Sequence, residues 1–197
     1  MIKIQALPVL VFVGVMLAWA AFIVVFLVRE KPKEAPDQKR DRSSIPGVVL
    51  QGLSYALVWS IHRPFFSPIA TLGSRVQIFL AVATILIAWV SVWIVGVAVK
   101  TLGKEWSVTA RLVQGHNLAT RGPYRFVRHP IYTGMLGMLV ATGLAIGHWI
   151  SLLVAIVVYF IGTVVRVRCE ERLLREEFGS EFDDYAGRVP AILPGVY

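Results

Sequence analysis

The chain has 197 residues, of which 56% are hydrophobic and 16% charged, and its mean hydropathy is +0.67. A soluble domain averages about 25% charged residues, so this composition excludes an ordinary soluble protein and predicts an integral membrane protein. The formal net charge of +8 comes from basic residues gathered in loops beside apolar segments. The positive-inside rule explains that pattern without nucleic acid as a partner.

Three apolar segments occupy the first half of the chain. Leu7 to Val28 is long enough to span a hydrocarbon core of about 30 Å, which favours a retained helix over a cleaved signal sequence. A charged loop at 29–45 follows. Ile45 to Ile61 is the second predicted span, and Val76 to Val99 is the third and clearest, because its 24 residues carry no charge.

The second half contains one long apolar run, from His129 to Val165. These 37 residues carry no formal charge with neutral histidine, and as a single helix they would be about 55 Å long, too long for one crossing. We therefore predict that the chain folds back near Gly143 to Trp149, which gives a helical hairpin at 130–165. The fold class is then an all-α polytopic membrane protein with about five transmembrane helices.

Basic residues alternate along the chain in a way that predicts its orientation. The segment from Arg29 to Arg42 has six of them, the loop from Lys100 to Arg128 has six and the tail from Arg166 has five. The N-terminus has one, and the segment between the second and third spans has two. This distribution predicts an outside N-terminus and a cytoplasmic C-terminus. The 100–130 loop and the C-terminal tail then share the cytoplasmic face.

The fifth predicted span continues into a charged amphipathic helix. Arg166 and Glu170 stand four residues apart, so they share a helix face, and Gly179 can end the helix. One interpretation is a solvated helix with ion pairs. The other is a functional site, because Arg166 follows directly on the apolar run, where an ionisable side chain is costly.

The segment before the hairpin, RGPYRFVRHPIYTG from Arg121 to Gly134, combines turn formers, imidazole and phenols. Pro130 favours a helix that starts there, and such a helix would present free backbone N–H groups to an anion. The alternative is that the arginines are positive-inside anchors and the tyrosines an aromatic belt. His116 and His129 lack a third ligand at helical spacing, so we predict no metal site.

Two stretches in one order carry a family resemblance: HNLATRGPYRFVRHPIYTG and, after the apolar hairpin, RVRCEERLLREEFGSEFDDYAGRVPAILP. They resemble the isoprenylcysteine carboxyl methyltransferase family, in particular its smaller prokaryotic members, which share features with phospholipid methyltransferases. The resemblance covers about half the chain, from Thr101 to Pro194. It implies S-adenosylmethionine as cofactor and a lipid-like acceptor that enters from the bilayer. It also implies an N-terminal membrane region at 1–99 and a catalytic region at 100–197.

The resemblance assigns roles to individual residues. The stretch at 116–119 matches the family's cofactor-contacting His-x-Leu-Val, with Ala119 in place of the usual valine. Arg166 matches the arginine assigned to the acceptor, while the role of Glu171 is open. Together, the positions that match cofactor contacts are His116, Asn117, Leu118, Ala119, Tyr124, His129, Pro130, Ile131, Tyr132 and Glu170.

The favoured function is formation of a methyl ester on an isoprenylcysteine-type or other hydrophobic carboxylic acid, with Arg166 and Glu170 as the catalytic pair. A guanidinium can donate two parallel hydrogen bonds to a carboxylate. A carboxylate acceptor is already ionised at neutral pH, so its methylation needs no general base. One alternative is N-methylation of an amine-bearing phospholipid. Another is a non-enzymatic transporter or assembly subunit with Arg166 and Glu170 as a structural pair. A third is a reductase, because membrane sterol reductases have a partly similar C-terminal region. The expected location is the inner membrane of a prokaryote.

Overall fold

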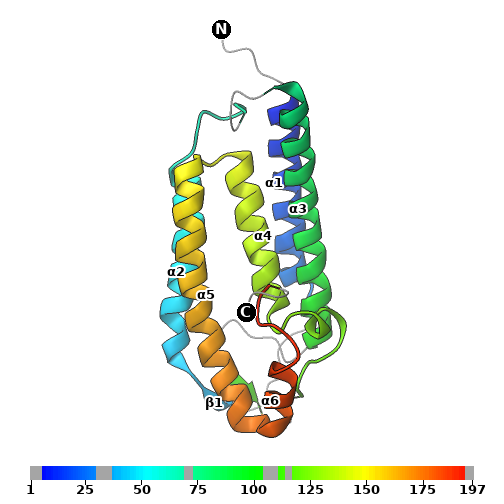
Figure 1. Cartoon of the computed structure of the whole chain (residues 1–197), viewed down its shortest axis with the longest axis vertical. Coiled ribbons are helices and arrows are strands. Elements are labelled where there is room, and N and C mark those ends of the chain that lie inside the picture. The colour runs from blue at the N-terminus through cyan, green and yellow to red at the C-terminus, as the bar shows by residue number, and fades with distance from the viewer. Residues whose placement is uncertain (1–5, 30–36, 69–72, 104–110, 114–116, 194–197) are drawn as a thin grey trace.

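In the computed structural model, the described residues are 6–29, 37–68, 73–103, 111–113 and 117–193. Five long helices run along the molecule, and a short sixth follows them (Figure 1). Their bounds are α1 (Ala6–Leu27), α2 (Ile45–Ser60), α3 (Ser74–Leu102), α4 (Pro130–Ala145), α5 (Trp149–Phe178) and α6 (Ser180–Ala186). The prediction of an all-α membrane protein is confirmed, and the predicted turn at 143–149 separates α4 from α5.

The helices form two pairs with α4 between them. α1 packs along α3 and α2 packs along α5, while α4 contacts both pairs (Figure 1). α4 is apolar around its circumference, and ten of its 16 residues are buried. The central position of α4 follows from that composition, since a helix without a polar face is stable only when surrounded.

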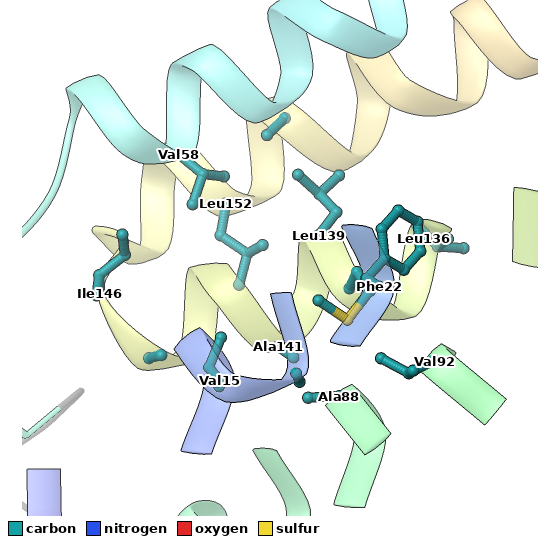
Figure 2. Packing of buried hydrophobic residues seen from close by; sticks show 14 of the residues in the cluster. Val15, Phe22, Val58, Ala88, Val92, Leu136, Leu139, Ala141, Ile146 and Leu152 are labelled. Atoms are coloured by element: carbon teal, nitrogen blue, oxygen red, sulfur yellow. The ribbon is translucent and has the colours of Figure 1, made fainter. Parts of the chain in front are cut away.

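Buried side chains from all five long helices meet around α4, as Figure 2 shows for Val15, Val58, Ala88, Leu139 and Leu152. Polar side chains add bonds between the helices. Trp19 in α1 donates to the Thr142 hydroxyl in α4 at 3.0 Å. In an apolar surrounding these bonds leave few polar groups unsatisfied, which helps to fix the helices relative to one another.

α3 approaches α4 closely because α4 presents two glycines to it. A Cβ at Gly134 would overlap Val95 and would lie 2.9 Å from the carbonyl oxygen of Ser91. A Cβ at Gly137 would overlap the hydroxyl of Ser91. Small residues three positions apart therefore set the distance between these two helices.

Three helices, α1, α3 and α5, are long and apolar enough to cross a membrane. α2 and α4 have 16 residues each, which corresponds to about 24 Å of helix, somewhat less than a hydrocarbon core of about 30 Å. Large apolar side chains lie exposed on the outer faces of the bundle. The protein is an integral membrane protein.

The two ends of the bundle differ in charge. At one end, here called the charged end, strand β1 (Asp37–Arg40) pairs antiparallel with β2 (Arg111–Val113). The sequence predicts both basic loops, at 29–45 and 100–130, but it does not predict that a strand from one pairs with a strand from the other. The segments 29–42, 100–128 and 166–188 that lead to the charged end contain 17 of the 20 basic residues and all 12 acidic residues. The described parts of these segments adjoin the same end of the bundle, and the orientation in the membrane stays a prediction.

At the opposite end a single arginine closes α4. Arg63 donates to the carbonyl oxygens of Leu144, Ala145 and Gly147 at 2.6–2.8 Å. The carbonyls of Leu144 and Ala145 belong to the last turn of α4, which has no further helical residues to donate to them, and Gly147 follows two residues after the helix. Arg63 therefore caps α4 with a positive charge at its negative dipole end.

Candidate active site

α5 continues without a break from the apolar bundle into the charged end, and its first charged residues belong to the candidate site. Arg166 and Glu170 lie one turn apart, with Nη2 of the arginine 3.2 Å from Oε1 of the glutamate. The Arg166 side chain is only 8% exposed, whereas Glu170 is 23% exposed. Gly179 ends the helix with a φ of 52°, which a glycine adopts easily. The predicted pair is present, with its acid nearer to the surface.

The start of α4 faces these charges. His129 precedes the helix, and Pro130 occupies its first position. The imidazole lies between two carboxylates, with Nδ1 3.4 Å from Glu170 Oε2 and Nε2 3.2 Å from Glu171 Oε1. Burial lowers the pKa of His129, but the two carboxylates outweigh it and raise that pKa above its ordinary value. The imidazolium form donates to both acids.

Tyr132 stands one turn further along α4 and joins the two halves of the cluster. Its ring stacks on His129 with centroids 5.5 Å apart and an interplanar angle of 9°. The guanidinium carbon of Arg166 lies 4.9 Å from the centre of the same ring. The phenol donates a short hydrogen bond to Glu170. Three of the predicted residues, His129, Tyr132 and Arg166, therefore contact Glu170 directly.

Arg128 links the cluster to the C-terminal tail, here residues 187–193. Its Nε donates to Glu171 Oε1 at 2.8 Å, and its Nη1 donates to the carbonyls of Ala186 and Val189. The backbone N–H of Arg128 donates to Pro190, at 2.8 Å. Sequence reasoning treated Arg128 as a charged flank and did not assign it to the site.

The tail also covers the start of α4. The N–H of His129 donates to Ala191 at 2.8 Å, and the hydroxyl of Thr133 donates to Ile192 at 2.6 Å. The prediction that this helix start presents free N–H groups to an external anion is therefore wrong for His129. The carboxylates found beside this end of α4 are the chain's own, on Glu170 and Glu171.

The remaining predicted residues lie in the segment before α4. Tyr124 sits in the 3-10 turn η3 (Gly122–Arg125) and is buried, which raises the pKa of its phenol well above the ordinary value. Its carbonyl accepts from the Tyr185 hydroxyl at 2.6 Å. Ile131 lies half-buried in the first turn of α4. Asn117 is exposed, Leu118 and Ala119 are half-buried, and His116 lies outside the described residues.

One site residue comes from α2, which sequence reasoning treated only as a membrane span. Gln51 is 2% exposed, and its Oε1 accepts from Arg166 Nη1 at 3.2 Å. Its Nε2 donates to the Thr163 hydroxyl at 2.9 Å. The available signal was a lone glutamine within an apolar run, but its partner depends on the packing of α2 against α5.

The charges of the cluster do not cancel. Arg128, Arg166 and the imidazolium of His129 are positive, whereas Glu170 and Glu171 are negative, which leaves one positive charge in excess. This sum covers these five side chains alone, and buried charges are stable when they are paired. Among the described residues, no group of three or more potential metal ligands has the arrangement of a metal site.

Comparison with known proteins places the chain among methyltransferases. A family model described as phospholipid methyltransferase matches residues 76–181, more than half of the chain. The protein-S-isoprenylcysteine O-methyltransferase B of Arabidopsis thaliana is 34% identical over 101 residues, which are 50% of this chain and 51% of that protein. The probable protein-S-isoprenylcysteine O-methyltransferase of Oryza sativa subsp. indica is 34% identical over 99 residues, 49% of this chain and 52% of that protein.

Another relative is named as a metal resistance protein and not as a methyltransferase. The nickel-cobalt-cadmium resistance protein NccN of Alcaligenes xylosoxydans xylosoxydans is 35% identical over 111 residues, which are 54% of this chain and 50% of that protein. The chain thus spans about half the length of these curated relatives.

The fold and the site together define an integral membrane protein with a cluster of charged side chains at one end of an apolar helical bundle. The matched region contains most of α3, all of α4 and α5, and therefore the whole cluster except Gln51. The chain belongs to the phospholipid methyltransferase family, and the resemblance found in the sequence is confirmed. The family implies a methyl donor.

Proposed function

We propose that the chain is an S-adenosylmethionine-dependent membrane methyltransferase that forms a methyl ester on the carboxylate of a lipid-like acid. The observation that carries this proposal is Arg166. Its guanidinium is buried where the apolar part of α5 ends, and its donors include one to the neutral amide of Gln51 and one to the carboxylate of Glu170. A guanidinium in this position suits an anionic headgroup whose tail remains in the lipid.

The cofactor side of the site fits the chemistry of the donor. A carboxylate accepts about four hydrogen bonds, and Glu170 receives bonds from Tyr132, His129 and Arg166. Its partial exposure leaves it able to accept from the ammonium of a ligand. The ring of Tyr124 or Tyr132 suits a nearby cationic sulfur, and the sulfonium of S-adenosylmethionine supplies an activated methyl group.

The other assigned cofactor contacts are adopted from the family resemblance. They comprise His116 to Ala119 in the loop and His129, Pro130 and Ile131 at the start of α4. The tail covers this region through its bonds to His129 and Thr133. Such a cover limits the access of water to the transferred methyl group. An in-line displacement depends chiefly on the alignment of donor and acceptor and on the exclusion of water.

The acceptor side is formed by α5 and α2. Exposed apolar side chains such as Leu53 in α2 and Val157 and Ile161 in α5 face outward toward lipid. An apolar tail can lie against these helices while its carboxylate contacts Arg166. Residues 100–197 then carry the transfer chemistry, and the membrane region at 1–99 contributes α2 to the acceptor side.

The charge distribution supports an orientation. Of the 20 basic residues, 17 belong to segments that lead to the charged end. We place that end, with the site, in the cytoplasm and the N-terminus outside, in a prokaryotic inner membrane. The water-soluble donor then reaches the site from the cytoplasm.

A second candidate is N-methylation of an amine-bearing phospholipid. The description of the family model names phospholipids, and Glu171 beside His129 offers an acceptor for the proton that an ammonium must lose. The guanidinium of Arg166 on the acceptor side suits an anionic group better than an ammonium, which places this candidate second.

One experiment distinguishes the candidates. Membranes that contain the full chain are supplied with methyl-labelled S-adenosylmethionine and either a prenylcysteine analogue or a native lipid extract. The proposal expects saturable cofactor binding and label that alkali releases as volatile product, because esters are base-labile. Label that withstands alkali would establish N-methylation instead. Absence of saturable cofactor binding would refute both and favour a non-enzymatic protein.

A further inference from the structure

We propose that Gln51 of α2 is a positioning residue that sets the acceptor preference of the site. It orients the guanidinium of Arg166 and, because its amide is neutral, adds no negative charge that would compete with the carboxylate of an acceptor. This inference rests on the proposed function. α2 lies outside the region that matches the family model, residues 76–181, so neither the family match nor the sequence resemblance assigns Gln51 a role.

The hydrogen bonds of Gln51 fix the direction of its amide. An arginine side chain has donors only, so the Gln51 oxygen must face Arg166, and its NH₂ group then faces Thr163. Both Gln51 and Thr163 are buried. A buried amide is costly unless it is bonded at both ends, so these partners hold Gln51 in a single orientation.

The backbones of α2 and α5 approach closely enough to make this contact. A Cβ at Gly47 would lie 2.5 Å from Cγ of Arg166 and 2.6 Å from the carbonyl oxygen of Gly162. A Cβ at Gly162 would lie 2.8 Å from the carbonyl oxygen of Gly47. Two glycines on facing helices therefore let the stem of Arg166 pass along α2, one turn before Gln51.

The neutrality of Gln51 distinguishes a specificity role from simple packing. A glutamate of the same shape would also accept from Arg166, but it would add a negative charge that competes with the carboxylate of the acceptor. A methionine of similar length would fill the space without orienting the guanidinium. If Gln51 only filled space, methionine would be tolerated and glutamate would not alter the choice between acceptors.

The test compares Gln51→Glu and Gln51→Met with Ser54→Ala in the full-length protein. Ser54 is the control because it is buried one turn further along α2 and its hydroxyl donates to the backbone carbonyl of residue 51, which every Gln51 variant retains. Equilibrium binding gives the dissociation constants of a prenylcysteine analogue and of S-adenosylmethionine. Labelled transfer gives kcat and KM, and thermal unfolding reports whether each variant folds.

We expect both Gln51 variants to raise the dissociation constant and KM of the carboxylate analogue by about tenfold or more, as for a lost charge-assisted bond. Cofactor affinity should stay within about twofold of the parent, because the bonds of Glu170 to α4 are retained. A prenyl amine should compete better with the carboxylate analogue in Gln51→Glu than in the parent. Ser54→Ala should resemble the parent.

The outcomes separate this inference from the proposed function. If the parent protein neither binds the cofactor nor transfers methyl groups, the proposed function fails. If the parent is active and both Gln51 variants behave like Ser54→Ala, the inference is overturned while the function stands. Equal losses of cofactor binding, acceptor binding and thermal stability would also overturn it, because they would indicate a general structural role.

Discussion

Arg128 at the start of α4 donates to Glu171 in α5 at 2.8 Å and so connects two segments that are 43 residues apart in sequence. The same guanidinium donates to the carbonyls of Ala186 and Val189. One side chain therefore holds three parts of the charged end together: the start of α4, the charged turns of α5 and the tail.

The first prediction concerns this link. Arg128→Ala leaves Glu171 without its arginine in a partly buried position, and breaking such a pair costs up to about 3–5 kcal/mol in the free energy of unfolding. The tail should also loosen, so hydrogen exchange at residues 187–193 should become faster. Exposed Arg125 is the matched control, since its replacement by alanine should change stability by less than about 0.5 kcal/mol. Unchanged exchange in the tail of Arg128→Ala would contradict this role.

The second prediction concerns pH. The pKa of His129 is raised by Glu170 and Glu171, which outweigh burial, and Tyr132 and Arg128 are its other polar neighbours. A raised pKa means that the stabilisation is fully present below the ordinary value near 6.5 and is lost as pH rises through the folded-state value. Thermal unfolding should therefore show stability that declines from pH 6 toward alkaline pH.

In His129→Asn this part of the decline should be absent. His148→Asn serves as the control, because His148 is exposed at the opposite end and asparagine can also cap α5. A parent protein and a His129→Asn variant with parallel stability profiles would show that the imidazole carries no charge-dependent stabilisation.

The third prediction separates the roles of Glu170 and Arg166. If the proposed function holds, Glu170→Gln should weaken cofactor binding by about tenfold or more, because it removes the negative charge proposed to pair with the cofactor's ammonium. Arg166→Ala should largely spare cofactor binding and lower turnover with a carboxylate acceptor. Isothermal titration with S-adenosylmethionine and labelled transfer measure the two effects. Equal loss of cofactor affinity in both variants would refute this division.

The fourth prediction tests the contact between α3 and α4. Gly134→Ala places a methyl group against Val95 and the backbone of Ser91, so the helices must separate. Overpacking of this kind costs about 1–3 kcal/mol, which thermal or denaturant unfolding in detergent can measure. In Gly52→Ala the new methyl group meets nothing within 4 Å, and the better helix propensity of alanine should stabilise α2 slightly. Equal stabilities of the two variants would rule out close packing at Gly134.

Local features of the site were predictable because they depend on short-range spacing. Arg166 and Glu170 share a helix face by their separation of four, and His129-Pro130 marks the start of α4. The ends of the membrane spans were predictable because charged or turn-forming residues follow each apolar segment. The hairpin turn followed from a run too long for one crossing.

Long-range features were not predictable in the same way. The contact of Gln51 with Arg166 requires that α2 pack beside α5. The sequence of an apolar helix does not indicate which other helix it packs against. The pairing of β1 with β2 joins two polar loops without a strand-like alternation of residues. The tail carbonyls that accept from His129 and Thr133 come from a segment with no regular structure, so the sequence showed only a helix start with unfilled donors.

The short length of α4 relates the site to the thickness of the bilayer. With its C-terminal end fixed by Arg63, a helix of about 24 Å in a hydrocarbon core of about 30 Å starts some 6 Å inside the opposite boundary. Arg166 and Tyr132 then lie at a depth where the carboxyl end of a lipid already resides. In a thicker bilayer the cluster would sink away from water, and in a thinner one it would be exposed to it. Methyl transfer by such a site would then depend on the acyl-chain length of the surrounding lipids.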